Sequence, residues 1–252
     1  KAFQVIEISN KKLRRSNSDL EEFAYVAAHD LQEPLRKIQS FGQLIQHDQA
    51  KILDDRGKEY FSLMTDAANR MQRLIADLLS YSRVASRSEP FQKVSLKKIY
   101  DDVKGDLSSA IAASSDQITA SDLPEIFCDE TQIHQLLQNL IGNALKFRHP
   151  DREPVITIDY EMQAESGNLQ GPVSIIRISD NGIGIDEKYR KSIFEPFKRL
   201  HDRQEYPGTG IGLAICQKIV SRHDGHISVG NSNLGGAQFI IELPVRENPT
   251  NQ

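Results

Sequence analysis

An alternation of three and four residues runs through the first part of the chain, and apolar or small side chains occupy most of its positions. These positions are Ile6, Asn10, Leu13, Asn17, Leu20, Ala24, Ala27, Leu31, Pro34, Ile38, Phe41 and Ile45. Such an alternation is the heptad pattern of helices that pack together through one seam. It predicts a single helix over residues 1–46. Asn10 and Asn17 on the seam favour a parallel, in-register dimer, although a buried amide lowers stability.

A second heptad pattern follows a polar segment at residues 47–56, which Gly57 closes. Its positions are Tyr60, Met64, Ala67, Met71, Leu74, Leu78 and Tyr81. Two helices that carry one apolar seam each cannot bury both seams within a single chain. We therefore expect a helical hairpin that dimerises into a four-helix bundle.

The heptad pattern breaks at residues 82–91, which are polar and include Pro90, so we expect an interdomain linker there. Beyond it, helical and strand patterns alternate. The expected helices lie at residues 96–111, 129–146 and 211–222. The expected strands lie near residue 118 and at residues 126–128, 154–162, 173–179, 226–230 and 237–243. This alternation predicts an α/β sandwich, with one helical layer on one mixed sheet.

The composition excludes several classes of protein. The 252 residues are 38% hydrophobic and 26% charged, and the net charge of −4 gives no basic surface for nucleic acid. No apolar run approaches the length of a membrane span, so we expect no membrane insertion by this chain and a cytoplasmic location. Cys128 and Cys216 lack metal-ligand spacing and are expected to be buried thiols. Because Lys1 already lies within a heptad, we expect the chain to continue upstream, which leaves a membrane anchor there open.

A histidine followed by an aspartate occurs four times, and only one such pair lies on a heptad helix facing outward. With Ala24, Leu31 and Ile38 as a positions, His29 takes the f position and Asp30 the g position. A solvated polar face is the plain explanation of this pair. A histidine that a rigid helix presents to water beside a carboxylate is also suited to chemistry.

Three polar residues share one face of the helix expected after Asp129. Asn139, Asn143 and Lys146 are spaced four and three apart. Amide oxygens can hold Mg²⁺, and a nearby lysine can meet phosphate oxygens. A polar outer helix face explains the same spacing.

Two glycine-containing segments follow. Asp180 ends an expected strand and precedes Gly182 and Gly184. Its carboxylate could accept a hydrogen bond from an exocyclic amine such as that of adenine. A turn explains the same residues equally well. Residues 208–212, Gly-Thr-Gly-Ile-Gly, open a helix whose first amides suit phosphate, but with the spacing of neither a P-loop nor a Rossmann motif. Residues 186–207, a charged segment with two phenylalanines, form a candidate lid.

The order of AHDLQEP, NLIGNALKF, SDNGIGI, IFEPFKRL and GTGIGLAI resembles the kinase core of two-component sensor histidine kinases, over residues 18–243. HDLQEPLRKI and FKRLHDRQEYPGTGIGLAIC are most similar to phytochrome-like or PAS-linked kinases. The resemblance implies a coiled-coil signalling helix at residues 1–18 and a dimerisation and histidine phosphotransfer domain at residues 19–84. It further implies a linker at residues 85–91 and a catalytic ATP-binding domain at residues 92–252.

The function implied by the resemblance is that of an ATP-dependent protein-histidine kinase, which forms a homodimer through its helical hairpin. His29 would be the phosphoacceptor and Asp30 its acid/base partner. The phosphoryl group would then pass to an aspartate of a response-regulator receiver domain.

The resemblance also implies ATP and Mg²⁺ as ligands of the second domain. Asn143 becomes the Mg²⁺ ligand, with Asn139 and Lys146 lining the phosphates, and Asp180 becomes the adenine acceptor. The other positions so assigned to nucleotide binding are Gly182, Gly184, Lys198, Arg199, Gly208, Thr209, Gly210 and Gly212. The two phenylalanines of the lid, Phe194 and Phe197, become its anchors.

This chain departs from the family pattern at two places. The family usually has Thr or Asn four residues after the phosphoacceptor, where this chain has Glu33, so we expect weak phosphatase activity. The last glycine box of the family commonly reads Gly-x-Gly-Thr-x-Phe, whereas residues 235–239 read Gly-Gly-Ala-Gln-Phe and lack the threonine.

Two other classes fit parts of the pattern. The ATP fold also resembles that of chaperone, gyrase and mismatch-repair ATPases, which hydrolyse ATP to drive clamping. Those proteins lack the heptad helix with an outward histidine, and they typically place a carboxylate base where this chain offers amides and Gln135. A non-catalytic dimeric scaffold is the other alternative, and the intact Asn143, Asp180 and lid glycines count against it.

Overall fold

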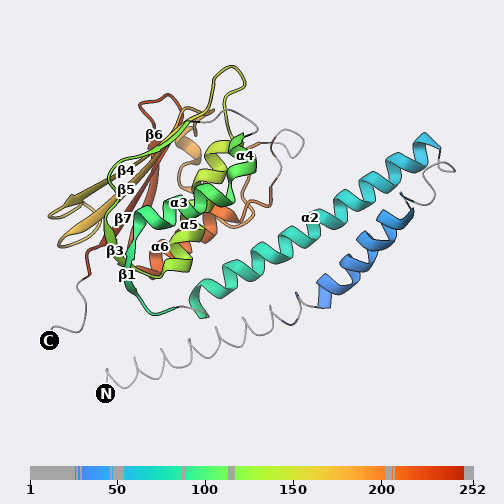
Figure 1. Ribbon diagram of the computed structural model, residues 1–252, viewed down its shortest axis with the longest axis horizontal. Helices are drawn as coiled ribbons and strands as arrows, with labels where there is room; N and C mark the ends of the chain where they lie inside the picture. The colour runs from blue at the N-terminus through green and yellow to red at the C-terminus, as the bar shows by residue number, and fades with distance from the viewer. Residues whose placement is uncertain are drawn as a thin grey trace. The chain divides into compact units, whose positions relative to one another are not determined.

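The computed structural model (Figure 1) describes residues 26, 28, 30–45, 47, 54–86, 89–112, 117–201, 206 and 208–246. The chain divides into two compact units, Lys1–Ser86 and Arg87–Gln252. The first is helical and the second combines helices with a mixed sheet, which confirms the predicted fold class. Among the described helices, none has the length and apolar character that crossing a membrane requires.

The first unit contains the predicted hairpin. Residues 30–45 are helical, and helix α2 spans Asp55–Ser86 (Figure 1, blue and cyan). The two helices lie side by side, because the side-chain amide of Gln39 donates to Asn69 Oδ1 at 2.7 Å and to Gln72 Oε1 at 2.8 Å. The heptad positions before residue 26 lie outside the described residues.

The first helix does not turn its heptad seam towards α2. Ala28 and Leu35 are buried, and they are seven residues apart at the e positions. Gly42 occupies the next e position, and a Cβ added there would lie 3.1 Å from Thr65 Oγ1 of α2. The seam residues, by contrast, are 41–63% exposed: Leu31, Ile38 and Phe41. The e positions of this helix are therefore the buried ones, while these three seam residues stay exposed in the single chain.

Helix α2 shows the same division between its two sides. Ala68 is buried. Four of the larger residues of its predicted seam are 42–65% exposed, namely Tyr60, Met64, Met71 and Leu78, whereas Leu74 and Tyr81 are half-buried. Both helices of the hairpin thus leave large apolar side chains in contact with water, which is unfavourable for a monomer.

The chain remains helical further than the sequence indicated. Helix α2 includes residues 82–86, where the heptad pattern ends and a linker was expected to begin. These residues contain neither proline nor glycine, and Val84 is buried. The helix therefore continues through them and ends at Ser86, before Pro90.

The second unit contains four helices and seven strands among its described residues. The helices are α3 (Leu96–Asp106), α4 (Ser108–Ala112), α5 (Glu130–Lys146) and α6 (Gly212–Arg222). The strands are β1 (Gln92–Ser95), β2 (Gln117–Ala120), β3 (Glu125–Cys128), β4 (Val155–Gln163), β5 (Val173–Asp180), β6 (His226–Asn231) and β7 (Ala237–Pro244). Two short 3₁₀ turns, η1 (Glu187–Tyr189) and η2 (Ser192–Phe194), precede α6.

Side-chain caps fix where two of the helices begin. Asp129 Oδ1 accepts from the backbone N–H of Gln132 at 3.1 Å, which is the cap that the sequence predicted for α5. Ser95 Oγ accepts from the backbone N–H of Lys98 at 3.2 Å and caps α3 in the same way. The helix predicted over residues 96–111 is interrupted at Leu107, where α3 ends and α4 follows.

The main sheet has the strand order β2-β4-β5-β7-β6. Only β2 and β4 pair in parallel, and the other neighbours are antiparallel, so the sheet is mixed as predicted. Strands β1 and β3 form a separate antiparallel pair. The sequence did not predict β1, because its four residues bury only Val94 and show no extended alternation.

Helices α3, α5 and α6 cover one face of the main sheet (Figure 1). Helix α5 lies between the other two and packs against both. The core between the layers is apolar and fully buried, as at Leu136 and Leu140 of α5, Ile176 of β5 and Ile219 of α6. This packing fixes the rotation of α5 about its axis and so decides which of its residues remain accessible.

Candidate functional site

The polar residues predicted on α5 share one side of the helix. Leu136 and Leu140 are buried, whereas Asn139, Asn143 and Lys146 are half-buried. The side-chain nitrogen Nδ2 of Asn139 is itself buried, and no described residue accepts a hydrogen bond from it. A buried N–H group without an acceptor costs free energy, so an acceptor atom supplied by a ligand suits this place.

The glycine segment, residues 208–212, runs against this side of α5. A Cβ added to Gly212 would lie 3.3 Å from Asn139 Oδ1, and one added to Gly208 would lie 2.7 Å from Lys146 Nζ. Helix α6 begins at Gly212, and the N–H groups of a helix's first turn attract anions. The structure thus brings together two groups of residues that the sequence had identified separately.

Two positive charges approach each other beside Gly208. The guanidinium group of Arg199 donates to the carbonyl oxygen of Gly208 and, at 2.9 Å, to that of Tyr206. Burial lowers the pKa of Lys146, and the charge of Arg199 lowers it further. Because like charges repel in a partly buried place, a bound anion such as phosphate would relieve the repulsion.

The carboxyl group of Asp180 stands at the end of β5 and is buried. Its Oδ1 accepts from the backbone N–H of Gly182 at 2.9 Å and of Ala237 at 3.0 Å. Among the described residues, Oδ2 has no hydrogen-bond partner. Burial raises the pKa of Asp180, and the two backbone N–H groups oppose that effect. One oxygen therefore has a structural role, and the other remains for a ligand.

Backbone segments pass so close to Asp180 that they leave no room for side chains. A Cβ added to Gly236 would lie 2.2 Å from Asp180 Oδ1 and 2.4 Å from the backbone nitrogen of Gly182. A Cβ added to Gly182 would lie 2.4 Å from the carbonyl oxygen of Phe147, at the end of α5. These contacts restrict both positions to glycine. Gly184, with φ +72, lies in the left-handed region.

The candidate lid contains η1 and η2. Phe194 is buried, but Phe197 is 57% exposed and has φ 65, a backbone conformation that bulky residues rarely adopt. Of the two predicted anchors, only Phe194 is therefore held by burial. Lys198 is exposed. Gly210 has φ +80, and a Cβ there would lie 2.8 Å from the Lys198 carbonyl oxygen, so both its backbone conformation and its surroundings favour glycine.

The glycine segment continues the chain after the lid. Thr209 Oγ1 accepts from the backbone N–H of Ile211 at 3.4 Å. Residues 202–205 and 207 lie outside the described residues. The lid contacts the glycine segment through Arg199, which donates to the carbonyl oxygen of Gly208.

An aromatic group that the sequence did not reveal connects the lid to α5. The ring of Phe147, the C-cap of α5, lies 5.0 Å from that of Tyr206 and 5.9 Å from that of His201. Lys146 Nζ lies 4.3 Å from the centre of the Phe147 ring. The only sign of this group in the sequence is that an aromatic residue, Phe147, directly follows Lys146. Its partners lie too far along the chain for spacing to connect them.

On the hairpin, the predicted phosphoacceptor His29 lies outside the described residues. Asp30 and Glu33 are helical and exposed. Glu33 Oε1 pairs with Lys37 Nζ at 2.7 Å, one helical turn further on. An ion pair this exposed contributes little to stability.

The side chains at α5 suit a ligand that carries phosphate groups better than a metal ion alone. Among the described residues no three His, Cys, Asp or Glu side chains are grouped to hold an ion. The amide of Asn143 is half-buried, and no described residue bonds to it. Its oxygen is a ligand type that Mg²⁺ accepts, and Mg²⁺ commonly takes few protein ligands and completes its shell with phosphate oxygens and water. Asn143 therefore fits a metal that arrives with phosphate.

Two family profiles match the chain. The His Kinase A (phospho-acceptor) domain matches residues 19–87. The profile described as "Histidine kinase-, DNA gyrase B-, and HSP90-like ATPase" matches residues 128–247. Together they cover most of the chain and include the hairpin, the face of α5 and the glycine segment.

Similar proteins include phytochromes of cyanobacteria. The chain is 42% identical to cyanobacterial phytochrome A of Nostoc sp., over 92% of this chain and 29% of that protein. It is 36% identical to the phytochrome-like protein Cph1 of Synechocystis sp., over 93% of this chain and 30% of that protein. The chain thus spans less than a third of the length of these relatives.

Solved structures share the fold. The structure of full-length ShkA in complex with AMPPNP has a TM-score of 0.66 at 23% identity, over 90% of this chain and 46% of that one. A nucleotide-free catalytic domain of the histidine kinase ThkA has a TM-score of 0.52 at 25% identity, over 62% of this chain and 97% of that one. At such low identity, the likeness to ShkA concerns the fold alone.

Replacing Asp180 by Asn should separate the two roles of this carboxyl group. An amide oxygen can still accept from Gly182 and Ala237, but an N–H donor replaces Oδ2. Because the pKa of Asp180 is raised in the folded chain, its ionised form lowers stability at neutral pH, and an uncharged amide removes that effect. We expect an unchanged or higher melting temperature without nucleotide. Titration calorimetry should show that the dissociation constant for the nucleotide rises roughly tenfold or more, which corresponds to a loss of about 1–3 kcal/mol of binding free energy.

Asp180→Ala is the matched control, since it leaves both backbone N–H groups without their acceptor. It should lower the melting temperature as well as the affinity. A nucleotide affinity that Asp180→Asn leaves unchanged would contradict the ligand role of Oδ2.

Proposed function

Because the chain belongs to the sensor histidine kinase family, we propose that it transfers the γ-phosphoryl group of ATP to His29. We further propose that the group then passes to an aspartate of a response-regulator receiver domain. The observation that carries the proposal is the convergence of Asn139, Lys146 and the glycine segment at one side of α5, with Asp180 beside its end.

The nucleotide would contact three kinds of group. Asp180 Oδ2 accepts from the exocyclic amine of adenine. Asn139 Nδ2, the cations of Lys146 and Arg199 and the first amides of α6 bind phosphate oxygens, because each is a donor or a positive charge that faces the same place. Mg²⁺, held by the Asn143 oxygen, would supply positive charge to the phosphates.

The transfer itself needs little from the protein beyond positioning and charge. One imidazole nitrogen of His29 attacks the γ-phosphorus, and an N–P bond forms. The bond from the γ-phosphorus to the bridging oxygen breaks, and ADP leaves. Asp30 accepts a hydrogen bond from the other ring nitrogen, which stabilises the imidazolium as it forms. The phosphorylated histidine then donates its group to a carboxylate, and the phosphoryl group leaves the imidazole.

The hairpin supports a homodimer. Its buried residues include Ala28 and Leu35 at e positions, while the seam residues Leu31, Ile38 and Phe41 remain exposed. A second copy can cover these side chains with its own equivalent surface, which is the symmetric solution that twofold dimers use. The four-helix bundle predicted from the heptads therefore explains an exposure that a single chain does not.

Replacing His29 by Gln should abolish protein phosphorylation. The f position does not contribute to the seam, so dimerisation and ATP affinity should remain within about twofold of the unaltered chain. Incubation with labelled ATP measures the phosphorylation, since the phosphoryl group of phosphohistidine is hydrolysed in acid and is stable in base. Released phosphate without labelled protein would instead indicate an ATPase, and neither signal would indicate a scaffold. Stable phosphohistidine in His29→Gln would mean that another histidine is the acceptor.

Replacing Ile38 by Glu should dissociate the dimer, because charged side chains would have to be buried at the seam. The molar mass in solution, measured by light scattering, should fall to that of one chain, while nucleotide affinity stays unchanged. Gln43→Glu is the matched control, since Gln43 is exposed at an f position of the same helix. A dimer that survives Ile38→Glu would contradict the proposed interface.

Glu33 should make the protein a weak phosphatase towards a phosphorylated partner. Glu33 lies one turn after His29 and is exposed, so its negative charge would face the dianionic phosphoryl group and repel it. We expect the lifetime of the phosphorylated regulator to be little changed by this protein and to shorten with Glu33→Asn. Faster decay with the unaltered chain, removed by Glu33→Gln, would show that Glu33 is itself the catalytic group.

A further inference from the structure

We propose that Phe91, Asp129 and Arg222 are positioning residues for the phosphoryl transfer, because they hold the segment Glu89–Phe91 on the ends of α5 and α6. This inference rests on the proposed function. The residues concerned are called the entry junction below: Phe91, Asp129, Gln132, Arg222 and His223. Their role would be to shorten the segment of free chain that connects the hairpin to the ATP-binding unit.

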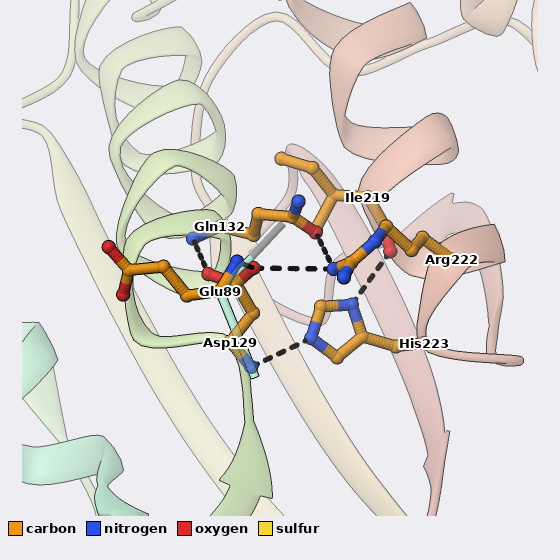
Figure 2. A network of polar contacts seen from close by, with 6 residues as sticks. All are labelled: Glu89, Asp129, Gln132, Ile219, Arg222 and His223. Atoms are coloured by element: carbon orange, nitrogen blue, oxygen red, sulfur yellow. Dashed lines mark hydrogen bonds and ion pairs between the residues drawn. The ribbon is translucent and has the colours of Figure 1, made fainter. Parts of the chain in front are cut away.

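Asp129 is the centre of the entry junction (Figure 2). Besides capping α5 through Oδ1, it accepts through Oδ2 from the backbone N–H of Glu89 at 3.0 Å and from Arg222 at 3.3 Å. Arg222 also donates to Gln132 Oε1 at 3.0 Å. Asp129 is 1% exposed, so its charge needs these partners. One buried carboxylate therefore joins the entering segment to both helices.

His223 completes the junction as a neutral ring. Its Nε2 accepts from the backbone N–H of Asp129 at 3.2 Å, so Nδ1 carries the hydrogen that it donates to the Ile219 carbonyl oxygen at 2.8 Å. Burial lowers the pKa of His223, which keeps this tautomer uncharged near neutral pH. The imidazole links the first residue before α5 to the last turn of α6 (Figure 2).

Phe91 attaches the entering segment by its ring. The ring stacks on His223 with centroids 4.6 Å apart and an angle of 13° between the planes. The guanidinium groups of Arg222 and Arg246 lie 5.2 and 4.4 Å from the Phe91 centroid. Phe91 is thus held by cation–π contacts with two arginines and by stacking on one imidazole ring. Three successive residues, Glu89–Phe91, are fixed at their first and last positions.

The entry junction lies at the opposite ends of α5 and α6 from the nucleotide residues. Asp129 precedes α5, whereas Lys146 is its last residue, and Gly212 begins α6, whereas Arg222 is its last residue. Seventeen residues of α-helix separate the two ends of α5 by roughly 25 Å. A substitution in the junction therefore leaves the nucleotide contacts unaltered.

The junction changes how far the two units can be from each other. Residues 82–86 belong to α2, and residues 89–91 are held on the second unit, so only positions 87 and 88 lie between. Release of residues 89–91 would lengthen the connection by roughly 10 Å. A longer connection lowers the effective concentration of the nucleotide site at the histidine, and it also loosens the orientation on which transfer depends.

The test compares Arg222→Gln and Phe91→Ala with the unaltered full chain. Lys104→Gln is the matched control, since it removes an exposed positive charge at the end of α3. Three quantities are measured: hydrogen exchange of the segment Glu89–Phe91, the dissociation constant for ATP, and the autophosphorylation rate at saturating ATP. Phe91→Tyr serves as a rescue variant, because it keeps the stacked ring.

Both variants should accelerate exchange of the segment at least tenfold and lower the saturated rate at least threefold, with ATP affinity within twofold. The control and the rescue variant should behave as the unaltered chain. Unchanged exchange overturns the anchor, and faster exchange with an unchanged rate overturns the positioning role. If labelled ATP does not phosphorylate the unaltered chain, the proposed function is overturned, and the positioning role with it. Hydrogen exchange needs no ATP, so it still shows whether the junction holds the segment Glu89–Phe91.

Discussion

The buried carboxylate of Asp180 is the contact on which the candidate site of the second unit depends. It receives the backbone N–H groups of Gly182 and Ala237, and Gly236 passes where a methyl group would lie 2.2 Å from Oδ1. Through these contacts the end of β5, the start of β7 and, by way of Gly182, the end of α5 are held at one point. The other oxygen of the same carboxyl group would bind the ligand, so a single side chain would stabilise both the fold and the complex. Burial raises the pKa of this side chain and so opposes its ionisation.

Helix α5 would serve two proposed roles from one rigid element. Its last turns present Asn139, Asn143 and Lys146 beside the glycine segment, and its N-cap Asp129 holds the entering chain. Apolar packing between α3 and α6 fixes the rotation of the helix and hence the direction of both ends. The two ends therefore keep a fixed orientation relative to each other, since packed cores deform little.

The hairpin shows a different balance of forces. Within one chain its helices meet through small or buried residues such as Ala28 and Ala68, and side-chain amides bridge Gln39 to α2. The larger apolar residues of the heptads are left in water. Their burial requires a second copy, so this unit depends on assembly, whereas the ATP-binding unit has a core of its own.

The sequence by itself determined the fold class and the positions with repeating or ordered patterns. Periods of 3.5 and 2 residues gave the hairpin and most strands, the Asp129 cap gave the start of α5, and the order of short motifs gave the family. Local periodicity suffices for such features because neighbouring residues produce them. Tertiary structure alone decided that α2 extends to Ser86, that β1 pairs with β3, and that Phe147 meets His201 and Tyr206. It also decided that Asp129, His223 and Phe91 form one junction, since contacts between distant residues depend on how layers pack and leave no period in the chain.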